Sequence, residues 1–201
     1  MRKSFDKLIS WTGLIMAGVL LVAGGLLMWA ATFVNNNVTE QLQAQKITMP
    51  AAAALTTQDM KDNLAQYSGQ QMTTGDQAKA YADHFILAHM NEASGGKSYS
   101  EVSGAYLKLA ADPNADQAQV AKLGELRQTL FMGSTLRGLL LYGYAFATMG
   151  KIAGIGAIVA FVGAVILTIL AVAGLNHARH LDEGTTTPEA TATPTPEPVT
   201  T

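Results

Sequence analysis

Residues 152–175 read IAGIGAIVAFVGAVILTILAVAGL, an apolar run without a single charged side chain. A helix needs about 20 apolar residues to cross a hydrocarbon core of ~30 Å, and this run is long enough. A second run lies near the N-terminus, where no charged or strongly polar side chain occurs between Gly13 and Ala31. The two runs predict transmembrane helices over residues 11–34 and 151–176.

The first run could also be a cleaved signal peptide. Such a peptide has an apolar core of about 7–15 residues, followed by small residues at the cleavage site. Here the core approaches about twenty residues, and Trp29 and Phe33 stand at its far end. Both features favour an anchor that is not cleaved.

The composition agrees with a membrane protein. Apolar residues make up 49% of the chain and charged residues only 14%, against roughly 25% charged residues in soluble domains. The net charge of −2 gives no global field that would attract nucleic acid, so no nucleic-acid partner is expected. The absence of cysteine excludes disulfides, cysteine zinc sites and thiol catalysis.

Basic residues in the short flanks of the spans indicate their orientation. The flanking side chains that carry or can carry positive charge are Arg2, Lys3, Lys7, His177, Arg179 and His180. Two spans place both ends of the chain on one side. We therefore expect a protein of the plasma membrane with both termini cytoplasmic, a basic flank over residues 1–10, and residues 35–133 exoplasmic.

The exoplasmic segment carries local signals for several short helices. Thr57, Thr74 and Ser98 each precede a helical stretch, and Gln77 and Glu101 complete the spacing of a capping box after the second and third. The expected helix ends are Gly69, Gly95-Gly96 and Pro113, and Asn114 is expected to start a fourth helix toward Phe131. One apolar stripe at helical period contains Ala78, Tyr81, Ala82, Phe85 and His89. The predicted fold is all-α, with two transmembrane helices flanking a small exoplasmic helical domain.

Residues 134–150 are apolar on nearly all sides but too short to span a bilayer. They predict an apolar interfacial helix, which either dips into the outer leaflet or extends the second span and packs against the exoplasmic helices. Aromatic and long basic side chains favour the water interface. The predicted membrane-interface residues are Trp11, Trp29, Arg137, Tyr142, Tyr144 and Lys151. The Thr- and Pro-rich tail, residues 177–201, cannot bury enough apolar surface and is predicted to be disordered.

No motif indicates a catalytic, cofactor or metal site. His84 and His89 are five residues apart, so they diverge by about 140° around a helix and lack the i, i+4 spacing of a helical metal pair. The carboxylates are spread singly, and no phosphate-binding loop or nucleophile elbow occurs. The spans carry no ionisable residue at mid-depth, where proton relays and pumps place one.

Three segments resemble a family of small actinobacterial two-span membrane proteins whose function is not established. They are Tyr67-Ser68-Gly69-Gln70-Gln71, the run from Gln77 to Phe85, and Thr129-Leu130-Phe131-Met132-Gly133 with the following residues 135–141. The resemblance covers residues 8–180. Members of such families are sometimes labelled aromatic ring-opening dioxygenases. Iron of that kind is held by two histidines and a carboxylate, a pattern that His84 and His89 do not form.

These observations lead to a functional hypothesis with two alternatives. The chain is expected to be a non-enzymatic membrane protein of the cell envelope, a scaffold, accessory subunit or sensor that acts through its exoplasmic domain on a membrane or envelope protein. The first alternative is a self-associating assembly, a homo-oligomer that could form a pore. The second is an iron-dependent ring-opening dioxygenase.

Overall fold

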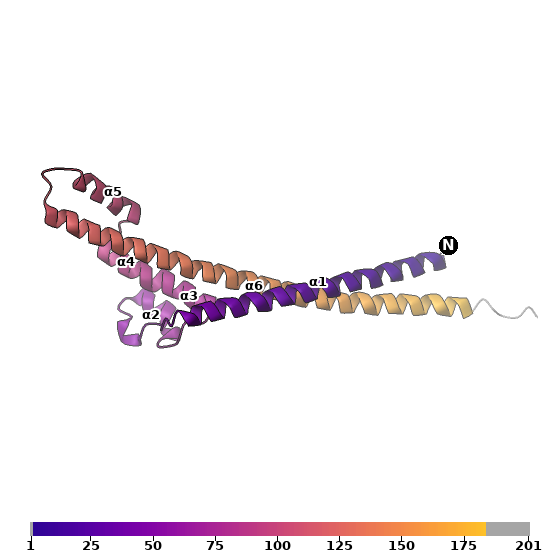
Figure 1. Ribbon diagram of the computed structural model, residues 1–201. Helices are drawn as coiled ribbons and strands as arrows, with labels where there is room; N and C mark the ends of the chain where they lie inside the picture. The colour runs from indigo at the N-terminus through magenta and orange to yellow at the C-terminus, as the bar shows by residue number, and fades with distance from the viewer. Residues whose placement is uncertain (1, 184–201) are drawn as a thin grey trace, which may run out of the picture. The chain divides into compact units, whose positions relative to one another are not determined.

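A computed structural model describes residues 2–183. The tail 177–201 was predicted to be disordered, but residues 177–183 continue the last helix, and the rest of this tail lies outside the described residues. Every regular element in this range is helical, and one isolated bridge pairs Thr48 with Gln71. The α-helices are α1 (Arg2–Ala44), α2 (Gln58–Leu64), α3 (Gly75–Ala80), α4 (Leu87–Ser94), α5 (Tyr99–Ala110) and α6 (Gln117–Glu183) (Figure 1). Shorter helical turns are η1 (Ala52–Ala54), η2 (Ala65–Tyr67) and η3 (Tyr81–Ile86). The all-α class is thereby confirmed.

The chain divides into two compact parts. We call the first the terminal helix pair, which consists of residues 2–26 of α1 and 157–183 of α6. The second is the central domain, Leu27–Gly156. Both α1 and α6 are long and apolar enough to cross a membrane, judged by length and composition.

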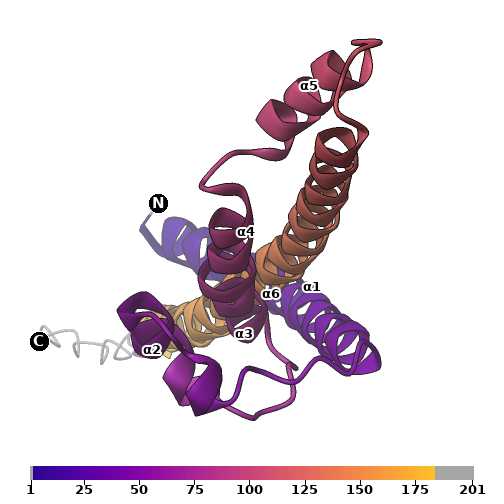
Figure 2. The same ribbon diagram turned by 90° about the vertical axis from the view of Figure 1, so that its left-hand side faces the viewer.

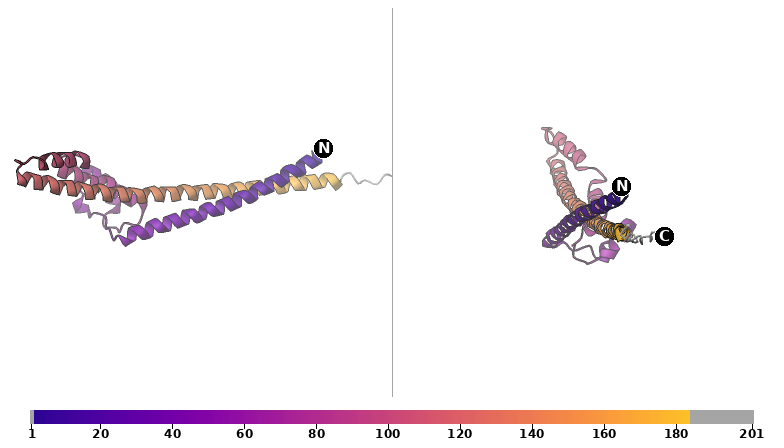
Figure 3. Two further views of the ribbon diagram at one scale, coloured as in Figure 1. Left: turned by 45° about the horizontal axis from the view of Figure 1, so that its top comes forward. Right: turned by 90° about the vertical axis from the view of Figure 1, so that its right-hand side faces the viewer.

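The terminal helix pair is packed through small residues. The N-terminal part of α1 lies beside the C-terminal part of α6 (Figures 1 and 3). A Cβ placed on Gly13 would lie 3.4 Å from the Cβ of Ala171, and one placed on Gly24 would lie 3.0 Å from the ring of Phe161. The buried residues of this pair are Ser10, Ala17, Gly24, Ala157, Ala160, Ala164 and Ala171.

Large apolar side chains of the terminal helix pair point outward. Only 17% of the residues in the most apolar stretch of α1 and 22% in that of α6 are buried. The exposed side chains include Ile15, Val19, Val22, Ile158, Val162, Val165, Ile166 and Ile169. This pattern, small residues inside and large ones outside, is the opposite of a water-soluble core.

The central domain has an ordinary hydrophobic core. Its largest fully buried side chains are Met49, Leu64, Met72, Val102 and Leu130. A bridge joins the segment that follows α1 to the segment that precedes α3 and closes one side of this core. In it, Met49 N donates to Gln70 O and Met72 N donates to Ile47 O, both at 2.8 Å. Burial of such side chains stabilises a domain by about 1.5–3 kcal/mol each, so packing alone can hold this cysteine-free domain.

Three predicted helix starts in the central domain, at Thr57, Thr74 and Ser98, are confirmed. Thr57 accepts a hydrogen bond from Met60 N at the start of α2, and both capping boxes, Thr74 with Gln77 and Ser98 with Glu101, are formed. Gly95 ends α4 in the left-handed conformation, at φ 64°. Side-chain caps of this kind contribute about 1 kcal/mol each.

The helix that starts at Thr74 contains a feature that the sequence analysis missed. α3, η3 and α4 follow one another without a break, and η3 is a π-helical stretch. The apolar stripe predicted here is buried at Ala78 and Ala82 and half-buried at Tyr81 and Phe85, but His89 is exposed. Figure 2 shows α3 and α4 beside α6, with α5 near the start of α6. Arg127 Nε there donates to Ser103 Oγ at 3.0 Å.

One predicted helix start was wrong, and both long helices continue beyond the predicted spans. α1 does not end at Val34 but runs through Asn35–Asn37 to Ala44, since asparagine lowers helix propensity without blocking the backbone. α6 begins at Gln117, because Asp116 rather than Asn114 accepts the bond from the first turn, from Ala118 N at 2.9 Å. The predicted fourth helix, the segment 134–150 and the second span form one helix, since no proline interrupts residues 117–183, and this agrees with the expected alternative in which the segment extends the second span.

Candidate functional site: a charged cluster and an amide-lined groove

In the central domain, α6 presents two unlike faces. Arg137, Tyr144 and Lys151 are seven residues apart, so they share one side of the helix. This inner side also carries Leu140 and Ala147, which are buried in the core that includes Ala78 and Ala82. The three residues predicted to lie at a membrane interface therefore face the α3–η3 helix.

Asp83 is the centre of a charged cluster on this inner side. Its carboxylate accepts a hydrogen bond from Lys79 Nζ, one turn earlier, and another from Arg137 Nη2 at 2.9 Å. Burial raises the pKa of Asp83, but the hydrogen bonds from Lys79 and Arg137 outweigh it and hold that pKa below its ordinary value. The hydrogen bond to Asp83 raises the pKa of Lys79. Asp83 therefore joins η3 to α6 through a charge-assisted bond.

A second ion pair lies farther along α6. Lys151 Nζ donates to Asp76 Oδ2 at 2.6 Å, with both side chains about half exposed. Lys79 Nζ lies 5.6 Å from the centroid of the Tyr144 ring, within cation–π range. A polar pocket of about 260 Å³ opens here, lined in part by Tyr67, Asp76, Lys79, His84 and Tyr144. One carboxylate, one lysine and one histidine line it, so its lining carries groups of both signs.

The two histidines of the central domain have different partners. His84 Nδ1 lies 2.8 Å from Asp59 Oδ2 and so ties η3 to α2. His89 Nδ1 lies 2.8 Å from the carbonyl oxygen of Phe85, and its ring packs on the Phe85 ring with centroids 4.4 Å apart. Within the part of the chain that the structure describes, no three histidine or carboxylate side chains come close enough to hold a metal ion.

The remaining predicted interface residues lie on open surface. Trp11, Trp29 and Tyr142 are each at least 60% exposed, and Trp29 stacks on Phe33 at 5.7 Å between centroids. The sequence analysis missed the partners Asp76 and Asp83. Asp76 and Asp83 are seven residues apart on one helix face, and Arg137 and Lys151 are fourteen apart on α6, but neither spacing shows which carboxylate meets which cation.

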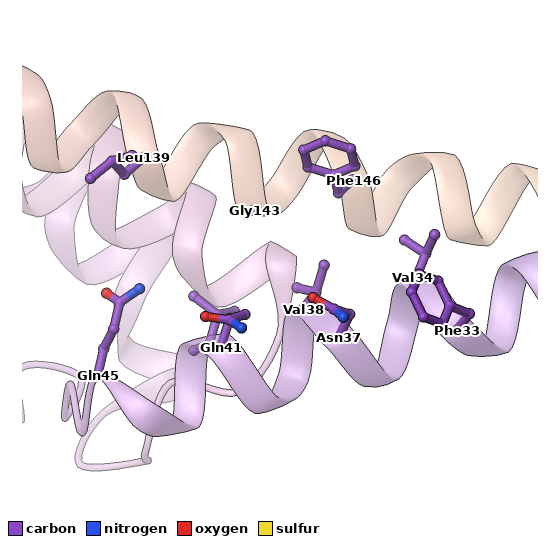
Figure 4. Close-up of a pocket in the computed structure, with 10 residues that line it drawn as sticks. Phe33, Val34, Asn37, Val38, Gln41, Gln45, Leu139, Gly143 and Phe146 are labelled. Carbon is purple, nitrogen blue, oxygen red and sulfur yellow. The ribbon is translucent and has the colours of Figure 1, made fainter.

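The outer side of α6 borders a groove with α1 inside the central domain. The groove has a volume of about 390 Å³. Figure 4 shows Asn37 and Gln41 on α1 and Gln45 directly after it, opposite Leu139 and Phe146 of α6. The other residues that line it are Phe33, Val34, Val38, Leu42 and Gly143. All of these side chains are uncharged.

Comparison of the chain with protein-family models, with curated proteins and with solved structures finds no match. The resemblance to the actinobacterial two-span family therefore stays a prediction. What can be said of function comes from the residues and their geometry.

Proposed function

We propose that this chain is a non-enzymatic integral membrane protein of the cell envelope, a scaffold, accessory subunit or sensor that acts through its central domain. The observation that supports insertion is the inverted packing of the terminal helix pair. In lipid no hydrophobic force drives large apolar side chains inward, so helices meet through glycine and alanine and turn larger side chains to the acyl chains. In water, the same surface would be a large exposed apolar patch.

We also infer the topology of the chain in the membrane. Both termini lie in the cytoplasm, and the segment between the spans, which contains α2 to α5, lies outside. A folded domain held by caps, ion pairs and a core of its own suits a role in contacting another envelope protein. We assign it no catalytic step.

Topology and insertion can be tested with the natural cysteine-free chain as background. Ser68→Cys should react with a membrane-impermeant maleimide in intact cells, and Ser4→Cys should react only after the membrane is permeabilised. The protein should stay in the membrane pellet after alkaline carbonate extraction. Release by carbonate, or labelling of Ser4→Cys in intact cells, would contradict the proposed arrangement.

The envelope partner can be sought by lysine cross-linking in intact membranes, followed by mass spectrometry. Lys97 and Lys122 are exposed on the central domain. Links from them to one other envelope protein would support an accessory or scaffold role. Turnover of a defined substrate by the purified protein would overturn the non-enzymatic assignment.

A further inference from the structure

The polar pocket beside Tyr144 collects side chains from α2, α3, η3 and α6, and its volume is about 260 Å³. Four of the side chains that line it can form strong hydrogen bonds: Asn63, Asp76, Lys79 and His84. Within residues 2–183, no hydrogen bond or ion pair joins any two of these four. Each of them is held instead by a side chain that does not line the pocket.

Asp59 holds two of the four groups. Its Oδ1 atom accepts a hydrogen bond from Asn63 Nδ2 at 3.2 Å, and its Oδ2 atom lies 2.8 Å from His84 Nδ1. A carboxylate at Nδ1 keeps the proton of the neutral imidazole on that nitrogen, so Nε2 is the atom that can accept a further bond. Asp59 thus orients both side chains.

The other two groups are held by charged partners. Asp83 accepts a hydrogen bond from Lys79, and Lys151 donates to Asp76 at 2.6 Å. Polar groups around a cavity whose orientation is set by a second layer of side chains are the arrangement that a precise binding site requires.

The backbone that carries His84 provides a second, independent observation. In η3 the N–H of Leu87 donates to the carbonyl oxygen of Ala82, five residues back, so this turn holds one more residue than an α-helical turn. Such π turns are rare and occur frequently at functional sites. Residues 81–86 contain no proline or glycine that would account for the turn locally. The turn places His84 against α2 and its neighbour Asp83 against α6.

The chemistry of the lining favours an uncharged ligand with many hydroxyl groups. A charged ligand would compete with the ion pairs that Lys79 and Asp76 already form. A hydroxyl group both donates and accepts, so it can bond to carboxylate, amide, ammonium and imidazole groups without breaking those pairs. Tyr67 and Tyr144 add aromatic surface for the apolar face of a sugar ring.

We propose that this pocket binds a neutral saccharide. Asn63, Asp76, Lys79 and His84 bond to its hydroxyl groups, and the ring of Tyr144 packs against its apolar face. The proposal deepens the proposed function by naming the class of ligand that an envelope sensor or scaffold would bind. It rests on that function only for the location of the pocket outside the cell.

Saturation-transfer NMR on the full chain in nanodiscs tests this, with glucose, mannose and galactose as probes. At least one of these sugars should receive saturation from the protein. Tyr144→Leu should weaken its binding about tenfold, whereas Tyr142→Leu should leave it unchanged. Tyr142 is the matched control, because it lies about 200° around the same helix and does not line the pocket. No transfer to any of the three sugars, or equal affinities of the two variants, would overturn the proposal.

The two histidines provide a second measurement. His84→Ala should weaken sugar binding about fivefold through the lost hydrogen bond. His89→Ala should not, because His89 bonds to the Phe85 carbonyl and does not line the pocket. Asp59→Asn should also shift the imidazole ¹⁵N signals of His84, since the ring loses its carboxylate. Unchanged signals would contradict the positioning role of Asp59.

Salt separates a neutral ligand from a charged one. Sugar binding should be the same at low and high salt, because no ion pair is broken or formed. Binding that falls at high salt, or tighter binding of zwitterionic alanine than of every sugar, would overturn the proposal. The NMR experiment uses purified protein, so a chain that binds sugar but whose Ser4→Cys variant is labelled in intact cells would contradict only the proposed function.

Discussion

The terminal helix pair and the central domain are packed in opposite ways. In the pair, the buried side chains are alanine, glycine and serine, and the large apolar ones face outward. In the central domain, methionine and leucine are buried, and polar side chains cap helices or form ion pairs. The proposed insertion of the terminal helix pair into a membrane accounts for this difference, because burial of large apolar side chains stabilises a fold only when the surroundings are water.

Glycine illustrates the same contrast at single positions. In the terminal helix pair, Gly13 and Gly24 let one helix approach the other, and a side chain there would meet its neighbour. In the central domain, Gly69, Gly95 and Gly96 have positive φ and serve to turn the chain. The same residue therefore acts through small size in one part and through backbone freedom in the other.

The largest effect is expected from the core of the central domain. Leu64 is fully buried, and Leu64→Ala should lower the free energy of unfolding by about 2–5 kcal/mol, since it removes buried methyl groups and leaves a cavity. Unfolding by urea in nanodiscs, followed by pulse proteolysis between α2 and α5, measures it. The control is Leu107→Ala, on α5, where the side chain is 58% exposed and the loss should be small. Equal losses would show that the core lies elsewhere.

The next effect breaks the close packing of the terminal helix pair. Gly24→Val would press against the Phe161 ring and should destabilise the contact by about 1–3 kcal/mol. Its neighbour Gly25 has open space, so Gly25→Val is a matched control with the same side chain. The readout is an intrachain disulfide between Gly13→Cys and Ala171→Cys, whose Cβ atoms would lie 3.4 Å apart, near the normal range. The prediction fails if both valine variants cross-link equally well.

The two parts also differ in how much the sequence reveals of them. Caps are local, so Thr74 with Gln77, Ser98 with Glu101 and the stop at Gly95 could be predicted from spacing alone. The apolar runs could be predicted equally well, because composition alone defines them. The ends of the helices were harder to predict. Asn35–Asn37 look like a boundary, but their polar side chains reach water from an unbroken helix, and nothing local shows that it continues.

Long-range pairs were not accessible from the sequence. Asp83 and Arg137 are 54 residues apart, and a lone arginine in an apolar segment is typical of a membrane interface. Only the position of η3 against α6 shows that it has a carboxylate partner. The groove lined by Asn37, Gln41 and Gln45 was missed for a related reason. Exposed amides in a helix are unremarkable until a second helix forms a groove with them.

A smaller effect tests the charged cluster. Asp83→Asn keeps the shape but removes the charge between Lys79 and Arg137, and it should cost about 1–2 kcal/mol because the side chains are partly solvated. The lowered pKa of Asp83 means that its contribution is complete above the unfolded pKa of about 3.9 and is lost as pH falls through the folded value. The wild type should therefore lose more stability than Asp83→Asn below about pH 4. Parallel pH profiles of urea unfolding would contradict this role.

The smallest effect is expected at Lys151. Its comparison with Arg137 tests two cations that were both predicted to lie at a membrane interface. Lys151 and its partner Asp76 are 58% and 49% exposed, so Lys151→Gln should change stability by only about 0–1 kcal/mol, less at high salt. Arg137 is less exposed, at 33%, and its partner Asp83 is only 20% exposed, so Arg137→Gln should cost more because it leaves a partly buried carboxylate with one hydrogen bond fewer. Unfolding of both variants at low and high salt measures the difference. Two results would contradict this order. One is an equal loss of unfolding free energy for Lys151→Gln and Arg137→Gln, and the other is a loss for Lys151→Gln that appears only in vesicles with anionic lipid. Either would mean that Lys151 acts mainly through the headgroups and that Asp76 is a secondary partner.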